Sequence, residues 1–112
     1  MEKLKKYQDI IVGYLNEQAK IIPANMPDIK SQVIVDKENN HFQLLQTGWQ
    51  GAKYVFTVVM HFDIMDGKVW FQRNITEHEA VDVLMERGVA KEDIVLGFRP
   101  VYARAHSGFA VA

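Results

Sequence analysis

The sequence predicts an α+β fold, in which an antiparallel four-stranded β-meander packs with an N-terminal helix and with a second helix after the last strand. Three observations carry this prediction: a helix-periodic first segment, a long β-hairpin pattern from Lys53 to Asn74, and a capping box after that hairpin. The length of 112 residues and the 48% of apolar residues suit one hydrophobic core. We therefore expect a single domain over residues 1–112.

The first helix is expected over residues 3–22. Apolar side chains recur there at the i, i+3, i+4 and i+7 spacing of one helical face, and charged side chains occupy the other face. Gly13 lies inside the segment at a cost of about 1 kcal/mol relative to alanine. Pro23 and Pro27 follow, and they end the helix because proline lacks the amide hydrogen that a helix needs.

A first hairpin is expected after this loop. Residues 32–36 and 41–47 are predicted as strands on either side of a turn at residues 37–40. Residues 48–51 then reverse the chain, and Trp49 in that turn is expected to pack against the protein.

The second hairpin is the clearest signal. Residues 54–64 alternate with the period of two that is typical of a strand, Asp66-Gly67 suits a type I′ turn, and residues 68–74 return. The expected cross-strand pairs are Ile64–Val69, Asp63–Trp70, Phe62–Phe71, His61–Gln72 and Met60–Arg73. The side chains expected in the core are Phe56, Val58, Met60, Phe62, Val69 and Phe71.

A capping box predicts the second helix. Thr76 is the expected N-cap and Glu79 its partner at N3, so the helix should run over about residues 77–87. Gly88 suits the C′ position, with Val89 as the hydrophobic contact that follows it.

The C-terminal region is mostly apolar. Residues 91–94 suit one more helical turn, and residues 97–100 break it. The tail at residues 101–112 is mostly apolar and ends without charge at residues 108–112, so it should dock on the sheet or on a partner. Residues 93–98 and this tail also suggest a self-association surface, which predicts a homodimer.

Composition excludes several functions. The chain has no cysteine, which excludes disulfides and thiolate chemistry. No apolar run follows the basic start, so neither a signal sequence nor a membrane span is expected, and the protein should stay in the cytoplasm. A formal net charge of -1 argues against tight, autonomous DNA binding. No nucleophile, phosphate-binding or dinucleotide-binding motif is present, so we expect no enzyme and no cofactor.

His61 and Asp63 share one face of the predicted hairpin. With Gln72 and Asn74 opposite, they could form an acid–base or metal cluster. An ordinary polar sheet face is the favoured interpretation, because a metal needs at least one further ligand and the sequence offers no obvious candidate. We therefore predict no catalytic residue and no metal site.

The remaining candidates are contact residues. Trp70 is equally compatible with an interface and with packing. Arg73 either reaches out at the end of the sheet or pairs with a buried carboxylate. Arg99, Arg104 and His106 could contact phosphate, but solvated tail charges are favoured. The residues predicted to contact a partner are His61, Asp63, Trp70, Gln72, Arg73, Asn74 and Phe109.

A family resemblance rests on a series of short segments. They are His41-Phe42-Gln43-Leu44, Gly48-Trp49, His61-Phe62-Asp63-Ile64, Asp66-Gly67-Lys68-Val69-Trp70, Gln72-Arg73, Thr76-Glu77, Gly88-Val89, Lys91-Glu92-Asp93-Ile94-Val95-Leu96-Gly97-Phe98 and Gly108-Phe109-Ala110-Val111-Ala112. In order and spacing they resemble the XisI family, the fdxN element excision controlling factors, over nearly the whole chain.

The resemblance implies a role in programmed DNA excision. A protein of this family works with a companion, XisH, and with a separate site-specific recombinase that cleaves the DNA. The family supplies no catalytic residues to carry over.

Three hypotheses remain open. In the first, the chain is an accessory factor that acts through protein contacts with an XisH-like companion. The companion looks nuclease-like, so the chain could restrain or direct it, and this regulation could also be unrelated to excision. In the second, it is a small architectural DNA-binding factor. The third is a metal-dependent module or enzyme that uses His61 and Asp63.

Overall fold

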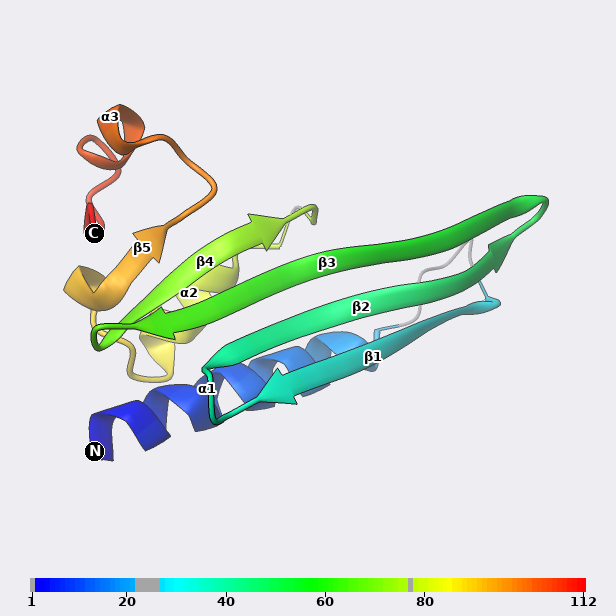
Figure 1. The fold of residues 1–112 in the computed structure, drawn as a ribbon, viewed down its shortest axis with the longest axis horizontal. Helices are drawn as coiled ribbons and strands as arrows, with labels where there is room; N and C mark the ends of the chain where they lie inside the picture. Colours follow the sequence, from blue (N-terminus) through cyan, green and yellow to red (C-terminus); the bar gives the residue numbers. More distant parts are fainter. Residues whose placement is uncertain (1, 22–26, 77) are drawn as a thin grey trace.

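The protein has an α+β fold with one five-stranded sheet (Figure 1). The computed structural model describes residues 2–21, 27–76 and 78–112. Its elements are α1 (Glu2–Ala19), β1 (Ile29–Asp36), β2 (His41–Gln50), β3 (Lys53–Met65), β4 (Lys68–Asn74), α2 (Ala80–Glu86), the 3-10 turn η1 (Lys91–Asp93), β5 (Ile94–Leu96) and α3 (Val101–Arg104). The spatial order is β1-β2-β3-β4-β5, and only β5 is parallel to its neighbour. The predicted class is confirmed, but the sheet has one strand more than predicted.

The additional strand is β5, which pairs with β4 through Val69–Ile94 and Phe71–Leu96. The N–H of Gly97 then donates to the carbonyl of Phe71 at 2.8 Å. All three side chains of β5 are buried. The expectation that residues 93–98 offer a self-association surface is therefore wrong for the strand itself, and the homodimer stays a prediction.

Helices α1 and α2 cover the same side of the sheet (Figure 1). Helix α1 ends at Ala19, three residues earlier than expected, and the end predicted at Ile22 and Pro23 lies outside the described residues. The helices and the sheet share one core, built mainly from Tyr7, Ile11, Tyr14, Leu15, Phe42, Leu44, Val59, Met60, Phe62, Ile64, Val69, Phe71, Ala80, Leu84, Ile94 and Leu96.

The predicted capping box does not form. The hydroxyl of Thr76 donates to Oδ1 of Asn74 at 2.6 Å and accepts the N–H of His78 at 3.2 Å. This turn uses the hydroxyl before the helix begins, so α2 starts at Ala80 with Glu79 as an N-cap that makes no side-chain cap bond. The C-terminal prediction is confirmed: the N–H of Val89 donates to the carbonyl of Leu84, and Gly88 has a φ of 115°.

A β-bulge in β3 changes which side chains reach the core. Leu44 pairs with Met60 but Leu45 pairs with Val58, so Val59 is an extra residue on β3. Val59 and Met60 both enter the core, and the alternation reverses before them. Phe56, predicted as core, is therefore 66% exposed, and Val58 is only half-buried outside the core cluster.

A second bulge lies in β4. The pairs Phe62–Phe71 and His61–Arg73 leave Gln72 as the extra residue. The predicted pairs His61–Gln72 and Met60–Arg73 are therefore wrong, and Met60 pairs with Asn74 instead.

Strand β2 extends further than predicted, through Gly48 to Gln50, and the chain reverses at Gly51-Ala52. Trp49 is thus a strand residue with 57% of its surface exposed, and the expectation that it packs in the interior is wrong. Within the described ranges, no helix is both long and apolar enough to cross a membrane.

Candidate functional site

The sheet surface opposite α1 and α2 carries the candidate site, and we call it the open face. Strand alternation places on it the side chains that do not enter the core. Near the middle of the sheet these are His41, Gln43, His61, Asp63, Trp70 and Gln72. The three predicted residues His61, Asp63 and Gln72 thus share a face, as the sequence indicated.

Two histidines meet one carboxylate on this face. Oδ1 of Asp63 lies 2.6 Å from Nδ1 of His41 and 2.7 Å from Nε2 of His61. His41 reaches Asp63 because the two residues are directly paired across β2 and β3. His61 reaches it from two positions along the same strand. We call His41, His61 and Asp63 the His–Asp–His cluster.

Two glutamines hold the cluster from the sides. Nδ1 of His61 lies 3.0 Å from Oε1 of Gln43, its cross-strand partner on β2. Nε2 of Gln72 donates to Oδ2 of Asp63 at 3.3 Å. The bulge at Gln72 therefore has a local consequence, since it brings this amide to the carboxylate.

The contacts within the cluster favour the charged forms of Asp63 and His41. Burial acts to raise the pKa of the Asp63 carboxyl, but the hydrogen bonds with His41, His61 and Gln72 and the charge of His61 outweigh it, and the pKa lies below its ordinary value. The hydrogen bond to Asp63 raises the pKa of His41, with burial acting in the opposite direction. The carboxylate is therefore ionised at neutral pH and available to a cation.

The third group, His41, is the member of the cluster that the sequence argument missed. Donor atoms of His41, His61 and Asp63 all lie within 4.8 Å of one another, which supplies the ligand number that the sequence did not reveal. The signal that would identify it is the β2–β3 register, and that register depends on the turn at Gly51-Ala52 and on the bulge at Val59.

Trp70 lies on the open face, is half-buried, and has the side chain of Arg104 over its ring. The Arg104 guanidinium lies 5.2 Å from the ring of Trp70. Arg104 also donates to the carbonyls of Arg99 and Val111. Its role in the structure is thus to fold the tail, while His106 is exposed.

Arg73 reaches out at the end of the sheet. It is exposed and donates from Nε to the carbonyl of Val58 at 2.6 Å. Of the two alternatives left open for Arg73, the buried ion pair is therefore wrong.

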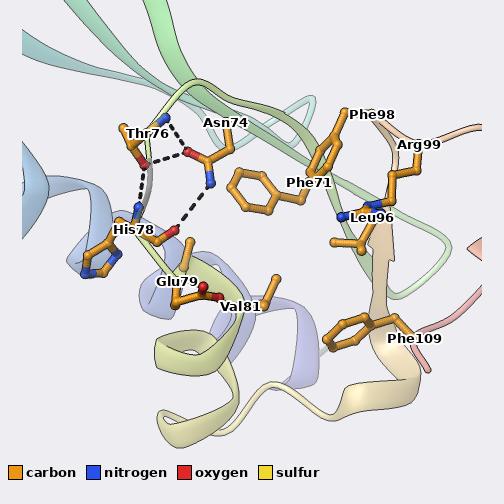
Figure 2. Close-up of a pocket in the computed structure, with 11 residues that line it drawn as sticks. Phe71, Asn74, Thr76, His78, Glu79, Val81, Leu96, Phe98, Arg99 and Phe109 are labelled. Carbon is orange, nitrogen blue, oxygen red and sulfur yellow. Dashed lines mark hydrogen bonds between the residues drawn. The ribbon is translucent and has the colours of Figure 1, made fainter. Parts of the chain in front are cut away.

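The last two predicted contact residues, Asn74 and Phe109, line a cavity of about 420 Å³ (Figure 2). Figure 2 shows its apolar wall and, across the cavity, a polar turn in which the Asn74 amide is hydrogen-bonded to Thr76 and to the backbone of His78. The apolar wall consists of Phe71, Leu96, Phe98 and Phe109. The volume and this mixed lining suit one apolar side chain or a small ligand.

A separate group of aromatic side chains lies at the far end of β2 and β3. This end extends past β4, whose pairing with β3 stops at Met60 (Figure 1). Trp49, Tyr54 and Phe56 are 57%, 54% and 66% exposed. Trp49 and Tyr54 are paired, with ring centroids 5.1 Å apart, and Phe56 follows Tyr54 on the same face. We call these three residues the arm patch.

A scan against protein-family models matches the XisI protein family over residues 1–111. The chain belongs to the XisI family. A search of the curated proteins found no match.

Two solved structures support membership of the XisI family. A XisI-like protein from Anabaena variabilis ATCC 29413 is 39% identical to this chain, with a TM-score of 0.87 over 97% of this chain and 99% of the other. The fdxN element excision controlling factor XisI from the same organism is 28% identical, with a TM-score of 0.83 over 98% and 99%. The resemblance predicted from the sequence is confirmed.

Proposed function

We propose that this XisI-family protein is a controlling factor for the excision of a DNA element, and that it acts by binding another protein rather than by cleaving DNA. Its similarity to a protein described as the fdxN element excision controlling factor supports the biological role. The partner we propose is an XisH-like companion, with the recombinase engaged indirectly.

The observation that carries the proposal is the arm patch. Three aromatic side chains, each more than half exposed, stand together on one face of the end of β2 and β3 that extends past β4. Exposed aromatic clusters are typical of protein interfaces, where Trp, Tyr and Phe are enriched and often contribute most of the affinity. The bulge at Val59 turns the β3 members Tyr54 and Phe56 away from the core side of the sheet, so that they share a face with Trp49.

Charge favours a protein partner over a duplex. The formal net charge of -1 supplies no excess of cations for a phosphate backbone. The second candidate is direct DNA binding, and one feature favours it: exposed aromatic rings on a sheet can also stack on unpaired bases.

The test is binding of the full chain to its companion, measured by co-purification and by titration. Phe56→Ser and Trp49→Ser together should weaken the complex at least about tenfold, because they remove two anchors of the arm patch. The matched control is Tyr102→Ser, since Tyr102 on α3 is 78% exposed and distant from the arm. Its affinity should equal that of the unmodified chain.

Two outcomes would overturn the proposal. Equal affinity of the arm variant and the control would remove the arm patch as the contact. The second outcome is salt-sensitive binding of the chain to single-stranded or duplex DNA at 50 mM salt. If the arm variant loses this DNA binding but still binds the companion, the DNA-binding alternative is established instead.

A further inference from the structure

We propose that His41, His61 and Asp63 form a binding site for a divalent transition metal of the zinc type. The proposal is independent of the arm patch and of any partner. It rests on the ligand set, on the spacing of the donor atoms, and on the way Gln43 orients His61.

The donor atoms lie slightly closer together than the ligands of a bound metal ion. Ligands at about 2.0–2.1 Å from a tetrahedral zinc ion lie about 3.3 Å from each other. Oδ1 of Asp63 is now 2.6 Å from Nδ1 of His41 and 2.7 Å from Nε2 of His61. Each pair therefore needs to separate by roughly 0.6–0.7 Å to admit the ion. Small rotations of the exposed His41 ring and of the Asp63 carboxylate provide this.

Gln43 orients the His61 ring. Oε1 of Gln43 lies 3.0 Å from Nδ1 of His61, and Oδ1 of Asp63 lies 2.7 Å from Nε2 of the same ring. Each ring nitrogen therefore has its own partner. A metal ion between Nε2 and Oδ1 leaves the contact of Nδ1 with Gln43 in place.

The surroundings resemble the outer shell of a metal site. A ligating histidine commonly donates its other ring N–H to an oxygen acceptor, and Oε1 of Gln43 lies 3.0 Å from Nδ1 of His61, in the position of such an acceptor. The amide of Gln72 donates to Oδ2 of Asp63 and leaves Oδ1 for the ion. Both amides lie on strands of the sheet, so they hold the ligands in a fixed orientation.

The ligand types select the metal. Imidazole nitrogen with one carboxylate suits zinc and similar first-row ions, whereas magnesium and calcium prefer sites made of oxygen alone. His41 is exposed, so water completes the coordination from the solvent side. The ion would join β2 to β3 through His41 and Asp63, which are paired residues.

The test is a calorimetric titration of the metal-free full chain with zinc chloride, together with the thermal unfolding midpoint at each metal concentration. We expect one ion per chain with a Kd in the micromolar range or tighter, and a rise of the midpoint with zinc because the ion binds only the folded chain. Magnesium chloride should neither bind nor compete. Cobalt substitution should give an absorption band typical of tetrahedral nitrogen and oxygen ligands.

Single variants locate the site. His61→Ala should weaken zinc binding at least about 100-fold, because it removes one of three ligands. His106→Ala is the matched control, since His106 is exposed in the tail, and it should bind as the unmodified chain does. If His61→Ala does not fold, His41→Ala gives the same readout from an exposed position. Substoichiometric binding, or equal affinity of the cluster variants and the control, would overturn the proposal.

Discussion

One carboxylate, Asp93, joins the first helix to the segment before β5. It is the one charged side chain counted as buried in the described part of the chain, with 9% exposed. The hydroxyl of Tyr7 donates to its Oδ2 at 2.6 Å, and Nζ of Lys3 lies 2.8 Å from the same oxygen. The N–H of Ala90 in turn donates to the Tyr7 hydroxyl at 3.2 Å. This network ties α1 to η1 by polar contacts in addition to the core.

The ionisation of Asp93 should make stability depend on pH. Burial acts to raise the pKa of this carboxyl, but the hydrogen bonds from Lys3 and Tyr7, assisted by the charges of Lys3 and Lys68, hold the pKa below its ordinary value. The unfolded chain, with a pKa of about 3.9, therefore takes up a proton first as pH falls. The stabilisation is complete above that pH and is lost as pH falls through the folded-state value.

Asp93→Asn should lower the free energy of unfolding at pH 7 by about 1.5–3 kcal/mol, because it removes hydrogen bonds to a charged group. The difference from the unmodified chain should shrink between pH 5 and pH 2. Urea unfolding at several pH values measures both effects. Asp82→Asn on the exposed face of α2 is the control and should change little. A difference that is constant over the whole pH range would exclude this role.

At the same scale, sequence reasoning found part of the candidate site. His61 and Asp63 are two positions apart on one strand, so alternation alone places them together. His41 lies 22 residues from Asp63, and only the strand register brings them into contact. Gln72 reaches Asp63 through a bulge, while Arg73 and Asn74 take other positions because the same bulge shifts their pairing.

Local sequence patterns predicted most of the helices and strands, but they did not predict which face of the sheet each strand residue occupies. The Asp66-Gly67 turn and the strands beside it follow from residue preferences and a period of two. A bulge adds one residue without changing composition, so the pattern before Val59 looks the same as the pattern after it. Phe56 and Met60 consequently read as one face, and they lie on opposite faces.

Two glycines give a sharp test of the elements. A Cβ at Gly48 would lie 2.5 Å from the carbonyl oxygen of Asp28, and its φ of +138° is unfavourable for other residues. A Cβ at Gly13 in α1 would meet nothing within 4 Å. The close contact that could have explained a helical glycine is therefore absent at this position.

Gly48→Ala should lower the free energy of unfolding by about 1–3 kcal/mol, because strain and a backbone clash add. Gly13→Ala should raise it by about 0.8–1 kcal/mol, which is the difference in helix propensity. Each variant serves as the control for the other in chemical denaturation. Shifts of the same sign in both would contradict this assignment.

For the whole molecule, the C-terminal tail closes the sheet beyond β5. The N–H of Ala110 donates to the carbonyl of Ile94 at 2.9 Å, and Ala110 forms a parallel bridge with Val95. Phe109 packs against the core, with Nζ of Lys91 5.5 Å from its ring centroid. The tail was expected to dock on the sheet or on a partner, and it docks on the sheet.

Truncation after Ser107 should lower the free energy of unfolding by about 1–3 kcal/mol, from the lost burial of Phe109 and the lost bond to Ile94. Val111→Ala is the control, since Val111 is exposed and should change stability by less than about 0.5 kcal/mol. Urea unfolding of both variants measures this. Equal stability of the truncated and the full chain would show that the tail contributes nothing to the fold.

The fifth strand, β5, could not be predicted from its own sequence, and the predicted sheet therefore had four strands. Three residues between a 3-10 turn and a glycine carry too short a pattern to identify a strand. Residues 94–96 form a strand because they pair with Val69 and Phe71 of β4, which lie 25 positions earlier in the chain. Strand β4 is the edge of the meander and offers these residues a free edge for pairing. Such a pairing depends on the assembled sheet, whereas a hairpin depends on its own turn.

The position of β5 also has a consequence for folding. The antiparallel pairs β1–β2, β2–β3 and β3–β4 each join consecutive segments, so they close short loops at a small entropic cost. Strand β5 can dock only after α2 and η1 have taken their places, and Ala110 can dock only on β5. Assembly should therefore proceed from the meander outward to the C-terminus. We expect the residues beyond β5, which dock last, to exchange their amide hydrogens faster than the strands of the meander in the native state.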